Sequence, residues 1–143
     1  MKKVIALVLA LACVFSLAGC TNNKEKIWEW TQGLKKEDII CATPKRQDGE
    51  FLVLEPLNDA QTLELVALLN NLTKESFTEN KKLTGGTPTF SIEIVMDSET
   101  YHLNEANGSY GALEISCNEK LWWIDNPELS AFVEAVTGSA SAE

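Results

Sequence analysis

The stretch FSIEIVM, Phe90–Met96, decides the fold class of this chain, because strongly apolar side chains occupy every second position along it. Neighbouring side chains of a strand point to opposite faces, so this alternation predicts a strand with one buried face. The same alternation recurs over Thr100–Asn104 and Leu113–Cys117, and short polar turns separate the three segments. Short turns imply antiparallel pairing. We therefore expect an antiparallel meander whose apolar face needs cover.

Further strands are expected on both sides of this meander, over Asp38–Thr43, Phe51–Leu54 and Leu121–Ile124. Asp48-Gly49 is a strong signal for a turn between the first two. Ile27–Trp30 fits either an edge strand or a first helical turn. The polar stretch Thr73–Thr87 is expected to be an exposed loop, with Phe77 as its one anchor.

Two segments carry the spacing of amphipathic helices. Asn58 and Gln61 have the spacing of a capping box, and an i, i+3, i+4, i+7 stripe follows them. Asn126 can cap a second helix, with Pro127 at its first position and Gly138 at its end. The apolar stripes of the two helices are Leu65, Leu68, Leu69 and Leu72, and Leu129, Phe132, Val133 and Val136. The order strand, strand, helix, strands, helix predicts an α+β fold: an antiparallel sheet of about five or six strands with two helices on one side.

The first 20 residues have the pattern of an export signal. Lys2 and Lys3 precede an almost wholly apolar run, Val4–Leu17, which is shorter than the roughly 20 residues that a bilayer requires. The run ends in Leu17, Ala18, Gly19 and Cys20, and these four residues resemble the lipobox of bacterial lipoproteins. The resemblance implies cleavage before Cys20 and a diacylglycerol on its sulfur. The alternative is an ordinary secretory signal with a chance cysteine.

This resemblance predicts the organisation and location of the chain. We expect a signal peptide over 1–19, a lipidated tether over 20–26, one α+β domain over 27–138 and a frayed tail over 139–143. The resemblance implies that membrane lipid is the anchor partner, through Cys20, and that the protein lies at the extracytoplasmic face of the cell membrane. The stretch LWWIDNPEL, Leu121–Leu129, is similar to small uncharacterised lipoprotein domains of Gram-positive bacteria. That resemblance implies no activity.

The charge balance argues against one class of partner. Removing residues 1–19 takes away two of the 12 basic side chains and none of the 21 acidic ones, so the net charge changes from −9 to −11. An acidic chain is not expected to bind nucleic acid. Cationic peptides, basic proteins and metal ions remain as partners, and plain solubility is the alternative explanation.

Two cysteines remain after the signal peptide and the lipidated residue are set aside. Cys41 lies two residues from Ile39, and Cys117 lies two residues from Ile115, so both are expected to face the core. An extracytoplasmic location permits a disulfide between them. Two buried free thiols are an equally acceptable interpretation.

The sequence contains no recognisable catalytic or cofactor motif, and we expect no cofactor. The polar face of the meander carries Glu93, Glu114 and the single histidine, His102. These carboxylates could meet a cation or a basic peptide, and a merely solvated face is the alternative.

The four tryptophans are the other candidate surface. Trp122 and Trp123 are adjacent, so one should face the core and the other should not. Trp28 and Trp30 share one side and lie close to Cys20. They suit a membrane interface or a partner pocket, unless all four cover one end of the core.

We expect a non-enzymatic binding or accessory module for a protein or peptide partner. The alternatives are a small carboxylate- or metal-dependent hydrolase and a structural envelope protein.

Overall fold

The computed structural model describes residues 23–79, 88–106, 113–118 and 120–138. The predicted signal peptide, the lipobox with Cys20 and the tail over 139–143 lie outside the described residues. No helix in the described ranges is both long and apolar enough to cross a membrane.

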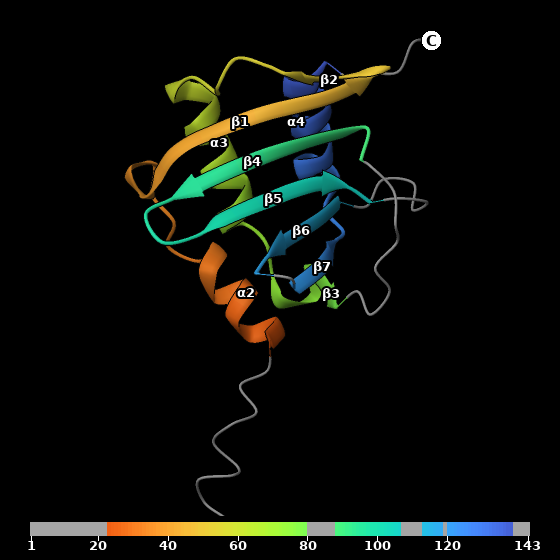
Figure 1. Ribbon diagram of the computed structural model, residues 1–143. Helices are drawn as coiled ribbons and strands as arrows, with labels where there is room; N and C mark the ends of the chain where they lie inside the picture. The colour runs from red at the N-terminus through yellow and green to blue at the C-terminus, as the bar shows by residue number, and fades with distance from the viewer. Residues whose placement is uncertain (1–22, 80–87, 107–112, 119, 139–143) are drawn as a thin grey trace, which may run out of the picture.

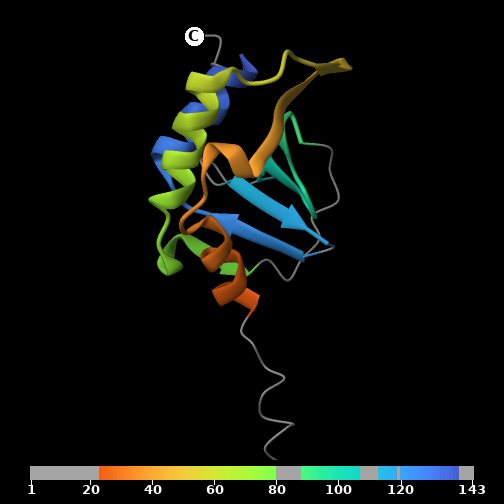
Figure 2. The ribbon, with the colours of Figure 1, turned by 90° about the vertical axis from the view of Figure 1, so that its left-hand side faces the viewer.

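The described residues form one seven-stranded antiparallel sheet with helices packed on one face, which confirms the α+β class (Figures 1 and 2). The strand order across the sheet is β2-β1-β4-β5-β6-β7-β3. The central strands β4 to β7 form the expected meander, with each strand paired to the next along the chain. The strands are β1 Ile39–Asp48, β2 Glu50–Val53, β3 Phe77–Glu79, β4 Phe90–Met96, β5 Thr100–Glu105, β6 Leu113–Cys117 and β7 Lys120–Ile124.

Helices α3 (Asp59–Asn70) and α4 (Pro127–Thr137) lie side by side on the same face of the sheet (Figure 2). The Asn58 side chain accepts from the backbone N–H of Gln61, and the Gln61 side chain accepts from the N–H of Asn58, so the capping box is complete. At the start of α4 the Asn126 side chain accepts from the backbone N–H of Leu129, and Gly138 ends the helix with φ +67°. Both helices therefore begin where the sequence predicts.

The core lies between the helices and the inner face of the sheet. The inner face carries the alternating residues that the sequence predicts, and the helices contribute one stripe each. Fully buried side chains from the two layers include Leu65, Leu69, Ile92, Ile94, Leu103, Ile115, Leu129 and Val133. Each such side chain contributes about 1.5–3 kcal/mol through removal from water.

Two local predictions are wrong. Residues 23–26, expected within a tether, begin helix α2 (Asn23–Thr31), which also includes the ambiguous segment Ile27–Trp30. The expected loop over Thr73–Thr87 contains a short 3-10 helix, Lys74–Ser76, and then β3. Phe77 is fully buried, which confirms it as the expected anchor, and it pairs with Ile124 of β7, so long-range pairing sets this strand.

The two cysteines do not form a disulfide, and both thiols are free. A register irregularity between Ile39 and Cys41 shifts the alternation of β1, so Ile39 and Ala42 are buried while Ile40 is 64% exposed. Cys41 therefore lies on the outer face with its partner Val95, whereas Cys117 follows Ile115 on the inner face. Strands β4 and β5 also lie between them. The expectation that both cysteines face the core fails because of this bulge.

Candidate functional site

The outer face of the sheet brings together the polar side chains that the sequence assigned to it. Pairing aligns them in two rows that run across the strands. One row holds Glu93, His102 and Ser116, and the other holds Ser91, Asn104, Glu114 and Trp123.

Glu93 sits within a small charged cluster on this face. The Lys45 Nζ lies 2.7 Å from the Glu93 Oε2, and the His102 Nδ1 lies 3.9 Å from the same oxygen. The side chains of Lys45 and Glu93 are 20% and 31% exposed. Partly solvated pairs of this kind stabilise a fold by about 1 kcal/mol or less. The cluster therefore holds Glu93 in place on a face that solvent reaches.

Glu114 has a different environment from Glu93. It is buried, with 8% of its surface exposed, and its Oε1 accepts a hydrogen bond of 3.0 Å from the indole Nε1 of Trp123. Buried carboxylates require such donors, because their desolvation is costly. The Glu114–Trp123 hydrogen bond therefore has a structural role: it satisfies a carboxylate that is buried in the packed sheet.

Glu93 and Glu114 do not converge. They belong to different rows and lie on β4 and β6, with β5 between them, so their strands are about 10 Å apart. Among the residues that the structure describes, no group of three His, Cys, Asp or Glu side chains is arranged to hold a metal ion. The paired carboxylates on which the hydrolase hypothesis depended are therefore not formed.

The tryptophans do not form one exposed surface. Trp122 faces the core and is 5% exposed, while Trp123 lies half-buried on the outer face, so the predicted difference between them is confirmed. Trp28 and Trp30 are half-buried and attach α2 to the body. The Trp28 Nε1 donates to the Leu72 carbonyl at 3.3 Å, and the Lys74 Nζ lies 4.6 Å from the centre of the Trp28 ring.

A small cavity of about 230 Å³ lies between α2 and the inner face of the sheet, where Trp30, Tyr101, Cys117 and Trp122 line it. The Tyr101 hydroxyl donates to the Glu99 Oε2 at 2.7 Å. Burial, then this bond to Glu99, raises the pKa of Tyr101 well above its usual range. Burial, then the Glu99 charge, also raises the pKa of Cys117. Both groups are therefore protonated at neutral pH, and Cys117 is not an activated nucleophile.

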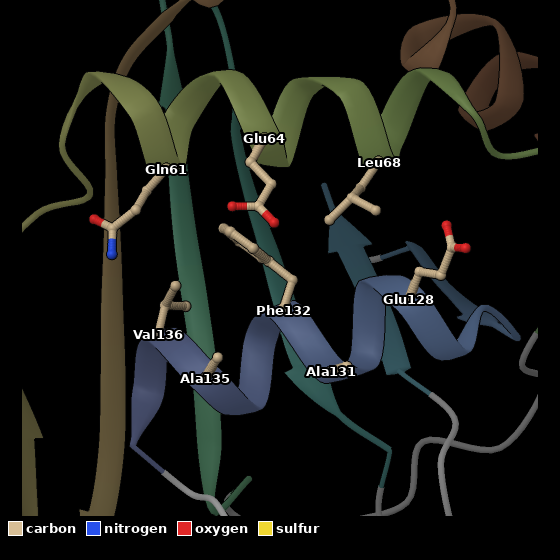
Figure 3. A pocket seen from close by; sticks show the side chains of 8 residues that line it. All are labelled: Gln61, Glu64, Leu68, Glu128, Ala131, Phe132, Ala135 and Val136. Atoms are coloured by element: carbon tan, nitrogen blue, oxygen red, sulfur yellow. The ribbon is translucent and has the colours of Figure 1, made fainter.

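A larger groove of about 590 Å³ runs between α3 and α4, on the side of these helices away from the sheet (Figure 3). Figure 3 shows Gln61, Glu64 and Leu68 projecting from α3 toward α4. The wall on α4 is formed by Glu128, Ala131, Phe132, Ala135 and Val136.

The groove combines an apolar floor with two acidic side chains. Phe132 is buried, and Leu68 and Val136 are half-buried, so the floor is firmly packed. Glu64 and Glu128 are exposed, and within the described ranges neither has a hydrogen bond or ion pair. Among the described residues that line the groove, none is basic. This geometry suits a ligand that is apolar on one side and positively charged beside it.

The sequence alone does not predict this groove. The residues that line it repeat at helical spacing on both helices, but only the fold shows that the two helices are neighbours. The available signal is the pair Ala131 and Ala135, because small side chains leave space beside a helix. No protein-family model matches the chain, and neither a curated protein nor a solved structure matches it.

Proposed function

We propose that this chain is a lipid-anchored binding module at the extracytoplasmic face of the cell membrane, and that it docks a cationic, partly apolar segment of a partner protein in the groove between α3 and α4. The observation that carries the proposal is the placement of Glu64 and Glu128 beside the apolar floor formed by Leu68, Phe132 and Val136. An amphipathic helix with basic residues beside its apolar stripe has the complementary chemistry.

Charge supports this choice of partner at two levels. The whole chain has a net charge of −9, which favours the approach of basic partners at a distance. At the groove, the carboxylates of Glu64 and Glu128 form no ion pair with any described residue, so they are available to meet Lys or Arg side chains. The lipid anchor on Cys20, inferred from the lipobox resemblance, would keep the module at the membrane surface.

Binding is tested with a synthetic amphipathic peptide that carries Leu on one face and Lys on the flanks, titrated by fluorescence anisotropy. The double variant Glu64→Gln/Glu128→Gln should weaken binding about fivefold to thirtyfold, since each of the two partly exposed ion pairs contributes about 0.5–1 kcal/mol. The matched control is Glu29→Gln/Glu37→Gln, which makes the same change in net charge on exposed residues outside the groove.

A steric variant tests the apolar part of the same site. Ala135 is exposed and lines the groove, so Ala135→Trp fills the groove without altering the core. It should abolish binding of the peptide. Equal weakening by the control pair, or unchanged binding by Ala135→Trp, would show that the peptide responds to net charge and not to the groove.

The anchor is tested separately by Cys20→Ala. The variant should leave the membrane fraction or remain as an uncleaved precursor of lower mobility. A variant that fractionates and migrates like the parent would show that the lipobox interpretation is wrong.

A further inference from the structure

The edge strand β2 is the most apolar exposed segment of the described chain. All four of its residues are exposed, and Phe51, Leu52 and Val53 are 52%, 40% and 64% exposed. Edge strands of soluble proteins usually carry charges or proline that discourage further pairing. Here Glu50 is the one charged residue of the strand. The β1–β2 hairpin also extends away from the helices, as Figure 2 shows.

The hydrogen bonds of the hairpin determine which backbone groups of β2 point outward. The Leu54 N–H donates to the Pro44 carbonyl at 3.0 Å, so Leu54 directs its backbone groups toward β1. Backbone direction alternates along a strand, so Leu52 also points toward β1, while Phe51 and Val53 point away from it. On the other side of β1, the Gln47 N–H donates to the Thr89 carbonyl at 2.7 Å, which fits the same alternation.

We propose that β2 pairs antiparallel with β2 of a second copy of this chain, around a twofold axis at Leu52. In this register Phe51 lies opposite Val53 of the other copy, and the same pair recurs on the other side of the axis. All four residues of these two pairs have outward-pointing N–H and C=O groups, so the pairing forms four main-chain hydrogen bonds. The contact is the same patch on both copies, as a closed twofold dimer requires.

The side chains are compatible with this register. Phe51 and Val53 pair with Gln47 and Lys45 of β1 and lie on the outer face of the sheet. Across the axis they form aromatic to β-branched pairs, which stabilise antiparallel sheets. Glu50 meets Leu54 of the other copy, so no like charges lie opposite each other. A four-residue contact buries far less than the roughly 1,600 Å² of a standard interface, so the dimer is weak and reversible.

A cysteine scan of β2 in the purified full chain tests the register. The scan uses a Cys41→Ser/Cys117→Ser background, and the covalent dimer formed by this background alone is the reference level. Leu52 of each copy lies opposite its own counterpart as a non-hydrogen-bonded pair, with Cα atoms about 4.5 Å apart, which a disulfide can bridge. Under mild oxidation Leu52→Cys should give at least five times more covalent dimer than Phe51→Cys or Val53→Cys. In those two variants the equivalent Cα atoms are about 8 Å apart, beyond disulfide reach.

A second variant tests the main-chain hydrogen bonds. Val53→Pro, added to Leu52→Cys, removes an N–H that points away from β1, so the hairpin keeps its own hydrogen bonds. The covalent dimer should fall to the background level, while circular dichroism matches the parent. Equal dimer at positions 51, 52 and 53 would mean random collision of apolar hairpins and would overturn the proposal. Absence of dimer at all three positions, or an undiminished dimer with Val53→Pro, would overturn it equally.

Discussion

Trp30 stacks on Tyr101, with ring centroids 3.8 Å apart and ring planes inclined by 17°. The Trp30 Nε1 also donates to the sulfur of Met96 at 3.2 Å. Because Trp30 belongs to α2 and Tyr101 to β5, this contact fastens the first described helix to the centre of the sheet. The stack also removes the Tyr101 ring from water, which has a consequence at high pH.

Stability should fall above about pH 10 because of Tyr101. Its pKa in the folded protein lies above the ordinary value, first through burial and then through the hydrogen bond to Glu99. The unfolded chain therefore releases this proton at about pH 10 while the folded chain retains it, and the stability present below pH 10 is lost as the pH rises. Urea unfolding from pH 8 to 11 should show a decline that is steeper for the parent than for Tyr101→Phe, by up to about 1.4 kcal/mol per pH unit. Parallel profiles would contradict this assignment.

The two adjacent tryptophans should differ in a denaturation experiment. Trp122→Ala removes a core side chain and should lower the free energy of unfolding by about 3–5 kcal/mol. Truncating an exposed side chain usually changes the free energy of unfolding by about 0.5 kcal/mol or less. For Trp123→Ala we expect a larger loss in the free energy of unfolding, because the Trp123 indole donates to the buried Glu114.

Trp123→Phe isolates that hydrogen bond and should lower the free energy of unfolding by about 1–3 kcal/mol. Combining it with Glu114→Gln in a double-mutant cycle gives the coupling energy. Additive effects in the cycle would mean that the bond does not stabilise the sheet.

Asn70 should contribute more to stability than its neighbour Asn71. The Asn70 Oδ1 accepts from the Leu34 N–H at 3.0 Å, and its Nδ2 donates to the Leu34 carbonyl at 2.9 Å, so one amide satisfies both backbone groups of a buried residue. Asn70→Ala should lower the free energy of unfolding by about 1–3 kcal/mol. Asn71→Ala, at an exposed position, should change it by about 0.5 kcal/mol or less. Equal losses in thermal or urea unfolding would show that the Leu34 contact is unimportant.

The parts of the fold that were predictable from sequence are those set by local chemistry. Asn58 and Asn126 begin helices because a short polar side chain next to an apolar stripe satisfies free N–H groups. The alternation in β4 to β6 fixed the face of each residue and hence the polar face with Glu93 and His102. Strand β3 was missed because three residues carry too short a pattern, and its pairing partner Ile124 is distant in sequence.

The errors at the candidate sites have the same physical origin. One extra residue at Ile40 reversed the face of Cys41, and no composition signal marks such a bulge. The groove between α3 and α4 depends on which helices are neighbours. From the sequence pattern alone, Leu68 and Val136 could therefore be core residues or groove-lining residues, and only the packing of the two helices distinguishes the two.

The strand order also determines the order in which the strands can pair during synthesis. Strands β4, β5 and β6 each pair with the next strand along the chain, whereas Ile39 of β1 pairs with Met96 and Phe77 of β3 pairs with Ile124. The β1–β2 hairpin and β3 are synthesised before β4 and β7, the strands that connect them to the sheet. Contacts between residues so distant in sequence slow folding. A chain that ends before β7 has no strand for β3 to join, although the sequence of β3 is intact. Strands β1 and β3 can therefore join the sheet only after β4 and β7, respectively, have been synthesised.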